Sequence, residues 1–240
     1  MNPVALVTGG GVRVGRAIAL GLVEGGYDLV VSYNSSGTGA ADVATEAARL
    51  GRRAHPVRAD LSREADAVRL ARSVADRFGR LDLLVNSASS FVANDLLEVT
   101  TEEWDAVMAV NLRAPFLLVR ETAALLRAAR GSIVNIVDLS ALRPWTSHPH
   151  HSVSKAGLLH LTKVMARALA PHVRANAVAP GHVLPPENFS PADIERDRRR
   201  VPLGRIGTPG DVVGAVRFLA GADYVTGEVI VVDGGLGLSG

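Results

Sequence analysis

Short runs of aliphatic and β-branched residues alternate with longer amphipathic segments from one end of the chain to the other. Most of the short runs are apolar at consecutive positions, which is typical of strands in a parallel sheet covered by helices on both faces. The pattern predicts seven strands, at residues 3–8, 28–33, 53–58, 81–86, 132–137, 173–179 and 228–232.

The amphipathic segments predict helices at residues 13–25, 39–50, 63–78, 101–128, 151–170 and 209–220. Start signals support two of them, because Asp60 and Ser62 precede the third helix and Thr100 to Glu103 precede the fourth. This alternation predicts an α/β fold, a Rossmann-type doubly wound parallel sheet with helices on both faces. The sequence shows no repeat, linker or shift in composition, so residues 1–240 are predicted to form a single domain.

One segment departs from the alternation. Residues 182–208 carry four prolines before the next strong helical pattern, with a short helical stretch at 191–200. Because this segment follows a late strand, it should lie at the carboxyl edge of the sheet, where open α/β folds bind ligands. We interpret it as a substrate lid, with a plain surface excursion as the alternative.

Composition narrows the classes of function. The 240 residues are 48% hydrophobic and 21% charged, and none is Cys, which excludes disulfides, thiolate metal sites and a cysteine nucleophile. Lys and Arg number 26 against 24 Asp and Glu, and the two signs alternate along the chain, so nucleic acid is not an expected partner. No apolar stretch reaches the ~18 residues of a membrane helix and no secretion leader is present, so we expect a cytoplasmic protein without a membrane partner.

A glycine-rich turn follows the first predicted strand. Gly9, Gly10, Gly11 and Gly15 lie between that strand and the first helix. Glycines in this context let the backbone approach a pyrophosphate, which then lies at the amino terminus of the helix. The turn therefore predicts a dinucleotide site.

The end of the second strand selects the form of the dinucleotide. A carboxylate there would bind the ribose hydroxyls of NAD and repel a 2′-phosphate. This strand instead ends in Ser32 and Tyr33, followed by Asn34, Ser35 and Ser36, with no carboxylate before Asp42. Hydroxyl and amide groups, with the charge of Arg13 from the glycine turn, predict NADP(H) in preference to NAD(H).

Seven short motifs in order resemble the short-chain dehydrogenase/reductase family over essentially the whole chain. They are Thr8-Gly9-x3-Arg13-x-Gly15, Asp60-Leu61, Asn86-Ser87-Ala88-Ser89, Asn111, Ser154-Lys155, Pro180-Gly181 and Val232-Asp233-Gly234-Gly235. The resemblance implies that the cofactor is lined by Gly9, Arg13, Val14, Gly15, Asn34, Ser35, Ser36, Asp60, Leu61, Asn86, Ala88, Lys155, Pro180, Gly181 and Val183. It also implies a small-molecule substrate and a homo-oligomer, with a tetramer favoured.

Three details look more like the pteridine reductase branch of that family. Arg13 replaces a second glycine, the 85–91 stretch is similar to that branch's cofactor loop, and Asp138 occupies the position of a catalytic Ser. This implies reduction of a pterin, dihydropterin or dihydrofolate, with Ser89 and Phe91 against the substrate. The alternatives are a carbonyl or 3-oxoacyl reductase of the same family, and an NADP-binding sensor or scaffold with little catalysis.

The family's catalytic Tyr-x3-Lys pair is altered in this chain. Lys155 matches the Lys, but His151 stands four residues before it in place of Tyr, and Asp138 lies thirteen residues earlier. The family pattern thus implies a catalytic set of Asp138, His151, Lys155 and Asn111, with Asp138 and His151 also against the substrate.

The charge of Lys155 should keep the His151 imidazole neutral, and partial burial should raise the pKa of Asp138 so that it delivers the proton. Asn111 is expected to hold a water or the active-site backbone. Asp138 as a loop cap and Phe91 as loop packing are the alternative roles. Six of the seven His lie between 148 and 182, but Pro149 and the adjacency of His150 and His151 disfavour a metal site.

Overall fold

The computed structural model describes residues 2–185 and 189–238. Its centre is a seven-stranded sheet in the order β3-β2-β1-β4-β5-β6-β7, and every neighbouring pair is parallel. The predicted fold class is therefore confirmed, and the predicted strands differ from the observed ones only at their ends. The strands are β1 (Val4–Val7), β2 (Asp28–Tyr33), β3 (Ala54–Arg58), β4 (Leu83–Asn86), β5 (Ser132–Ile136), β6 (Arg174–Pro180) and β7 (Val229–Val232).

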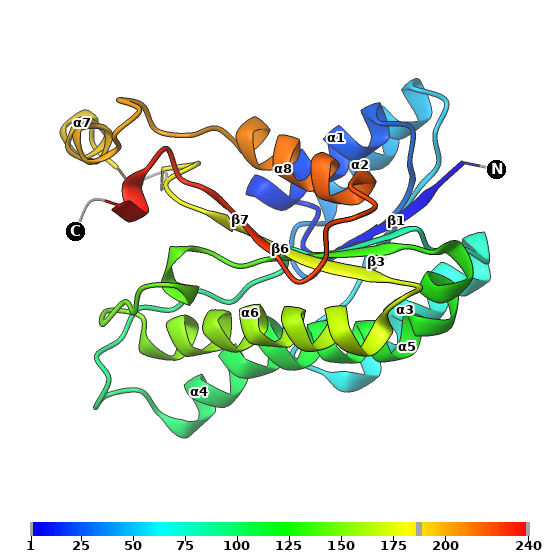
Figure 1. Cartoon of the computed structure of the whole chain (residues 1–240), viewed down its shortest axis with the longest axis horizontal. Helices are drawn as coiled ribbons and strands as arrows, with labels where there is room; N and C mark the ends of the chain where they lie inside the picture. The colour runs from blue at the N-terminus through cyan, green and yellow to red at the C-terminus, as the bar shows by residue number, and fades with distance from the viewer. Residues whose placement is uncertain (1, 186–188, 239–240) are drawn as a thin grey trace.

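Helices cover both faces of the sheet. The α1, α2 and α8 helices lie on one face, and α3, α4, α5 and α6 lie on the other (Figure 1). Their bounds are α1 (Arg13–Glu24), α2 (Gly37–Arg49), α3 (Glu64–Phe78), α4 (Thr101–Met108), α5 (Ala114–Ala129), α6 (Pro149–Leu169), α7 (Pro191–Arg200) and α8 (Pro209–Gly221).

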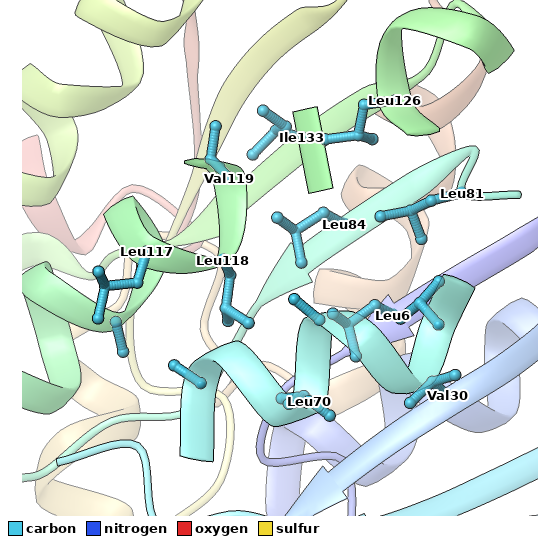
Figure 2. Close-up of a cluster of buried hydrophobic side chains, with 14 of the residues drawn as sticks. Leu6, Val30, Leu70, Leu81, Leu84, Leu117, Leu118, Val119, Leu126 and Ile133 are labelled. Atoms are coloured by element: carbon cyan, nitrogen blue, oxygen red, sulfur yellow. The ribbon is translucent and has the colours of Figure 1, made fainter. Parts of the chain in front are cut away.

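The alternation of side chains along each strand builds two separate cores. In β4, Leu83 packs into the cluster beneath α1 and α8, whereas Leu84 packs with Leu6 and Ile133 into the cluster beneath α3 and α5 (Figure 2). Successive side chains of a strand point to opposite faces, so a central strand must be apolar throughout. With both faces occupied by apolar side chains, polar chemistry is left to the ends of the strands.

Strands β2 and β3 lie on one side of β1, whereas β4 to β7 lie on its other side. Sheets of this class bind ligands at the point where the strand order reverses, which here lies between β1 and β4. The hydroxyl of Thr8 ties the two strand ends together, because it accepts hydrogen bonds from the backbone N–H of Ser87 (2.9 Å) and Ala88 (3.0 Å). Gly9 has a φ of 65°, and a Cβ at this position would lie 2.9 Å from the Cα of Ala88. The loops after β1 and β4 can approach this closely only with glycine at position 9.

The single helix predicted at 101–128 is divided. A capping box between Thr100 and Glu103 starts α4 as predicted, but a π-helical turn, Ala109–Arg113, separates α4 from α5. Pro115 explains the division, because it has no N–H to donate to the carbonyl of Asn111 and its ring crowds that carbonyl. The π-helical turn contains Asn111, a residue of the predicted catalytic set, and such turns frequently lie at functional sites.

We predict that Leu84→Ala lowers the free energy of unfolding by about 2–5 kcal/mol, because it leaves a cavity in a core where Leu84 is fully buried. Urea unfolding followed by circular dichroism measures the change. Leu97→Ala is the matched control, since Leu97 is 94% exposed, and its effect should stay within about 0.5 kcal/mol. Equal effects of the two substitutions would contradict this description of the core.

Candidate active site

A cleft of about 1110 Å³ opens at the carboxyl ends of β1, β2, β4 and β5. It brings together residues that are widely separated in the chain, and most of the predicted site residues line it. Those that do are Gly9, Arg13, Val14, Gly15, Asn34, Ser35, Ser36, Asp60, Leu61, Ala88, Ser89, Phe91, Asp138, His151, Lys155 and Pro180.

Four predicted residues lie outside that lining. The Asn86 amide is buried between strands, where it donates to Asn135 Oδ1 at 2.7 Å. Gly181 packs against Asp233, Val183 belongs to the core beneath α8, and Asn111 is fully buried behind the cleft. Nothing in the pattern of the sequence separates residues that shape the wall of a cleft from residues that face into it.

The glycine turn has the shape that a pyrophosphate requires. A Cβ at Gly15 would lie 2.3 Å from the carbonyl oxygen of Gly9, and one at Gly11 would lie 2.7 Å from that of Ser36. These backbones pass each other with no room for side chains, which leaves the start of α1 open to the cleft. The polar end of β2 forms the adjoining wall, so the described residues fit a dinucleotide that carries a 2′-phosphate.

Asp138 follows β5 and makes two kinds of contact. One carboxylate oxygen caps the next turn, accepting hydrogen bonds from the backbone N–H of Ser140 at 2.9 Å and from the Ser140 hydroxyl. The other oxygen, Oδ2, lies 2.7 Å from Nε2 of His151. The capping role and the role within the site are therefore not alternatives, because one side chain fills both.

His151 lies in the first turn of α6 and is only 2% exposed. Its Nε2 faces Asp138, and its Nδ1 lies 3.1 Å from the carbonyl oxygen of Ser90. Sequence reasoning missed the Ser90 carbonyl, since a backbone acceptor leaves no signal in residue type. The imidazole is thus held from both sides rather than pointing freely into the cleft.

Lys155 lies one helical turn beyond His151 and is almost fully buried. Its ammonium donates to the carbonyl oxygen of Ile136 at 2.9 Å, at the end of β5. Burial lowers the pKa of the Lys155 ammonium, and the negative charge of Asp138 opposes that shift. A buried cation beside the cleft therefore faces the same carboxylate as His151.

The expected raised pKa of Asp138 is wrong. Burial does raise the pKa of this carboxyl, but the hydrogen bond from His151 and the charge of Lys155 outweigh burial and hold the pKa below its usual range. Asp138 is accordingly a carboxylate at neutral pH and accepts hydrogen bonds. The sequence placed Asp138, His151 and Lys155 in one site but could not reveal how close together these side chains lie.

Asn111 projects from the π-helical turn onto the backbone of Ser90. Its Oδ1 accepts from the Ser90 N–H at 2.7 Å, and its Nδ2 donates to the Ser90 carbonyl at 3.0 Å and to the Ser154 hydroxyl at 2.9 Å. This geometry agrees with the expectation that Asn111 holds the active-site backbone. The spacing of Asn111 and Pro115 is a signal in the sequence that could have predicted this turn.

Aromatic rings form the outer wall of this end of the cleft. Phe91 is 57% exposed, and its ring stacks on His148 with centroids 4.1 Å apart and meets His151 edge-on at 4.7 Å. Trp145 lies parallel to His151 at 6.3 Å. Phe91 thus packs in its loop and also presents a ring to the cleft. Across the described residues, no group of three or more His, Asp or Glu could hold a metal ion.

The segment at 182–208 begins against the glycine turn. Arg13 has a φ of 49°, and its guanidinium donates to the carbonyl oxygen of Leu184 at 3.0 Å. His182 pairs with Asp197 of α7 at 3.0 Å, which connects the start of the segment to its helix. Residues 186–188 of the predicted lid lie outside the described residues, and the lid itself stays a prediction.

These features define the class of the protein: a nicotinamide-dependent oxidoreductase with a doubly wound sheet and a buried lysine beside the cleft. Residues 11–237 match the protein family described as enoyl-(acyl carrier protein) reductase. The chain belongs to the short-chain dehydrogenase/reductase family. Among the described helices, none is both long and apolar enough to cross a membrane.

The chain is 36% identical over 240 residues to a 3-oxoacyl-[acyl-carrier-protein] reductase of Synechocystis sp., covering 97% of this chain and 96% of the relative. It is 34% identical over 242 residues to the enzyme of that name from Staphylococcus epidermidis, covering 98% and 99%. A blue fluorescent protein from a metagenomic library, solved in complex with NADPH, matches 98% of this chain and 97% of its own with 33% identity and a TM-score of 0.90. These two curated relatives are not pteridine reductases, so they do not support the expected resemblance to that branch.

We predict that Asn34→Asp raises the Kd for NADPH by roughly tenfold or more, because it places a carboxylate where a 2′-phosphate would lie. The Kd for NADH should stay within about twofold of the wild-type value or decrease, and this second cofactor is the internal control. Fluorescence titration of both cofactors measures the ratio. A wild-type protein that binds NADH more tightly than NADPH would contradict the assignment of the polar end of β2 to a 2′-phosphate.

Proposed function

We propose that this protein is an NADPH-dependent reductase of 3-oxoacyl thioesters or closely related small carbonyl compounds. The observation that carries the proposal is the contact of His151 with Asp138 beside the buried ammonium of Lys155, at the end of the dinucleotide cleft. The full-length similarity to two 3-oxoacyl reductases supports the same class of substrate.

Carbonyl reduction places a negative charge on the substrate oxygen, and the residues at this end of the cleft suit that demand. When bound, NADPH supplies the hydride for the carbonyl carbon. Lys155 places positive charge near the developing alkoxide, and the contacting pair of His151 and Asp138 supplies the proton that the oxygen takes. Asp138 orients the imidazole, and Asn111 fixes the Ser90 loop against it.

The ionised Asp138 weakens the argument for a pterin. That argument needed a protonated Asp138 to deliver the proton, and the ionised carboxylate cannot serve as that donor. The exposed ring of Phe91 is the remaining observation that favours a flat substrate such as a pterin.

We also propose that the protein is a homotetramer. The face formed by α5 and α6 exposes Phe116, Val153 and Val164, each close to half exposed, and a groove of about 870 Å³ runs beside it. A second copy of the chain covering this face would bury these side chains.

Light scattering is expected to give a mass of four copies of the 25.1 kDa chain, and Phe116→Asp should lower that mass. A light-scattering mass of one chain for the wild-type protein at micromolar concentration would contradict the proposal.

We predict that the purified protein oxidises NADPH with an acetoacetyl thioester and that Lys155→Ala lowers kcat/KM by about 10²-fold or more. Lys163→Ala is the matched control, because Lys163 is the only other lysine and lies exposed on the same helix. Dihydrobiopterin, dihydrofolate and a crotonyl thioester are run in parallel. Turnover only on the pterins or only on the crotonyl thioester would assign another substrate, and NADPH binding without any turnover would favour a sensor or scaffold.

A further inference from the structure

We infer that Arg13 binds the diphosphate of the dinucleotide rather than its 2′-phosphate, and that it joins the cofactor to the segment after β6, residues 181–185. The inference deepens the proposed function, because it concerns the cofactor of the same site, and its tests need no substrate. It departs from the expectation that the charge of Arg13 selects NADP(H) over NAD(H).

The backbone of Arg13 has an unusual conformation. Its φ is 49°, and among the described residues Arg130 is the other residue besides glycine with a positive φ. Arg130 ends α5, where a left-handed residue commonly closes a helix, whereas Arg13 begins α1. A Cβ crowds the backbone in this conformation, and such strain is found mostly at sites where the side chain has a role that glycine cannot fill.

The side chain of Arg13 is directed away from the polar end of β2. Its Nη2 donates to the carbonyl oxygen of Leu184 at 3.0 Å. Leu184 follows β6, which lies on the opposite side of β1 from β2 in the sheet. The residues expected to contact a 2′-phosphate, Asn34 to Ser36, directly follow β2. The charge of Arg13 therefore serves the β6 side of the cleft and not the 2′-phosphate.

Core packing brings the segment after β6 to the start of α1. Val183 is buried in the core beneath α8. The α8 helix packs along α1 so closely that a Cβ at Gly21 would lie 2.4 Å from Val213 (Figure 1). The contact of Arg13 with Leu184 is thus supported by the packing of two helices.

The diphosphate suits the donors that Arg13 has left. Its expected position is the amino terminus of α1, and Arg13 is the first residue of that helix. A guanidinium has five N–H donors, and the bond to Leu184 uses one of them. The others can form paired, charge-assisted hydrogen bonds to phosphate oxygens. Arg13 can therefore hold the diphosphate and Leu184 at the same time.

This double contact links cofactor binding to α7. His182 belongs to the same segment and pairs with Asp197 of α7 at 3.0 Å. A cofactor that fixes Arg13 therefore also fixes the segment after β6, and through His182 it stabilises α7. Because α7 has Arg196 and three consecutive arginines at 198–200, trypsin can report on its local unfolding.

Fluorescence titration of both cofactors tests the diphosphate assignment. Arg13→Gly should raise the Kd for NADPH and for NADH by the same factor, about tenfold, because both contain the diphosphate. Glycine favours this backbone conformation, so the Tm of the variant should equal or exceed that of the wild type. Arg16→Ala is the matched control, because Arg16 lies on the same helix and pairs with Asp42 at 3.8 Å. It should leave both Kd values within about twofold.

A rise in the Kd for NADPH alone would assign Arg13 to the 2′-phosphate and overturn the inference, and so would unchanged Kd values for both cofactors. In the double variant with Asn34→Asp, the two factors for NADPH should multiply, because the substitutions act on different phosphates. A wild-type protein that binds neither cofactor would instead count against the proposed function.

Limited proteolysis tests the link to α7, with mass spectrometry to locate the cuts. NADPH at a saturating concentration should slow tryptic cleavage within α7 by about threefold or more in the wild type and in Arg16→Ala. In Arg13→Gly this protection should be lost, even at an NADPH concentration that saturates the variant. Equal protection of the wild type and Arg13→Gly would overturn the link, and the titration would still decide the diphosphate assignment.

Discussion

Burial of the sheet on both faces is the constraint from which the rest of the molecule follows. Because α1 and α8 cover one face and α3 and α5 the other, the central strands have apolar side chains at nearly every position. A polar side chain can approach solvent only where a strand ends. The parallel direction of all the strands collects those ends on one edge, so the glycine turn and Asp138 line one cleft although more than a hundred residues separate them.

The same burial explains why the unusual residues of the site belong together. A lone buried carboxylate would lose hydration without compensation, and His151 and Lys155 supply that compensation to Asp138. In contact, the imidazole and the carboxylate each offset the cost of burying the other, and Ser140 and Ser90 provide the remaining hydrogen bonds of the pair. His151 and Asp138 are therefore best understood as one unit of the site.

The sequence was sufficient for the fold because the fold depends on periodicity. Consecutive apolar positions marked the seven strands, and the Thr100 capping box marked the start of α4. The sequence failed where a single residue breaks a regular pattern, as Pro115 does by forcing the π-helical turn that positions Asn111. It also failed for backbone groups, which every residue has, such as the Ser90 carbonyl. The direction of the Asp138 pKa shift depended on a distance of 2.7 Å that no spacing in the chain contains.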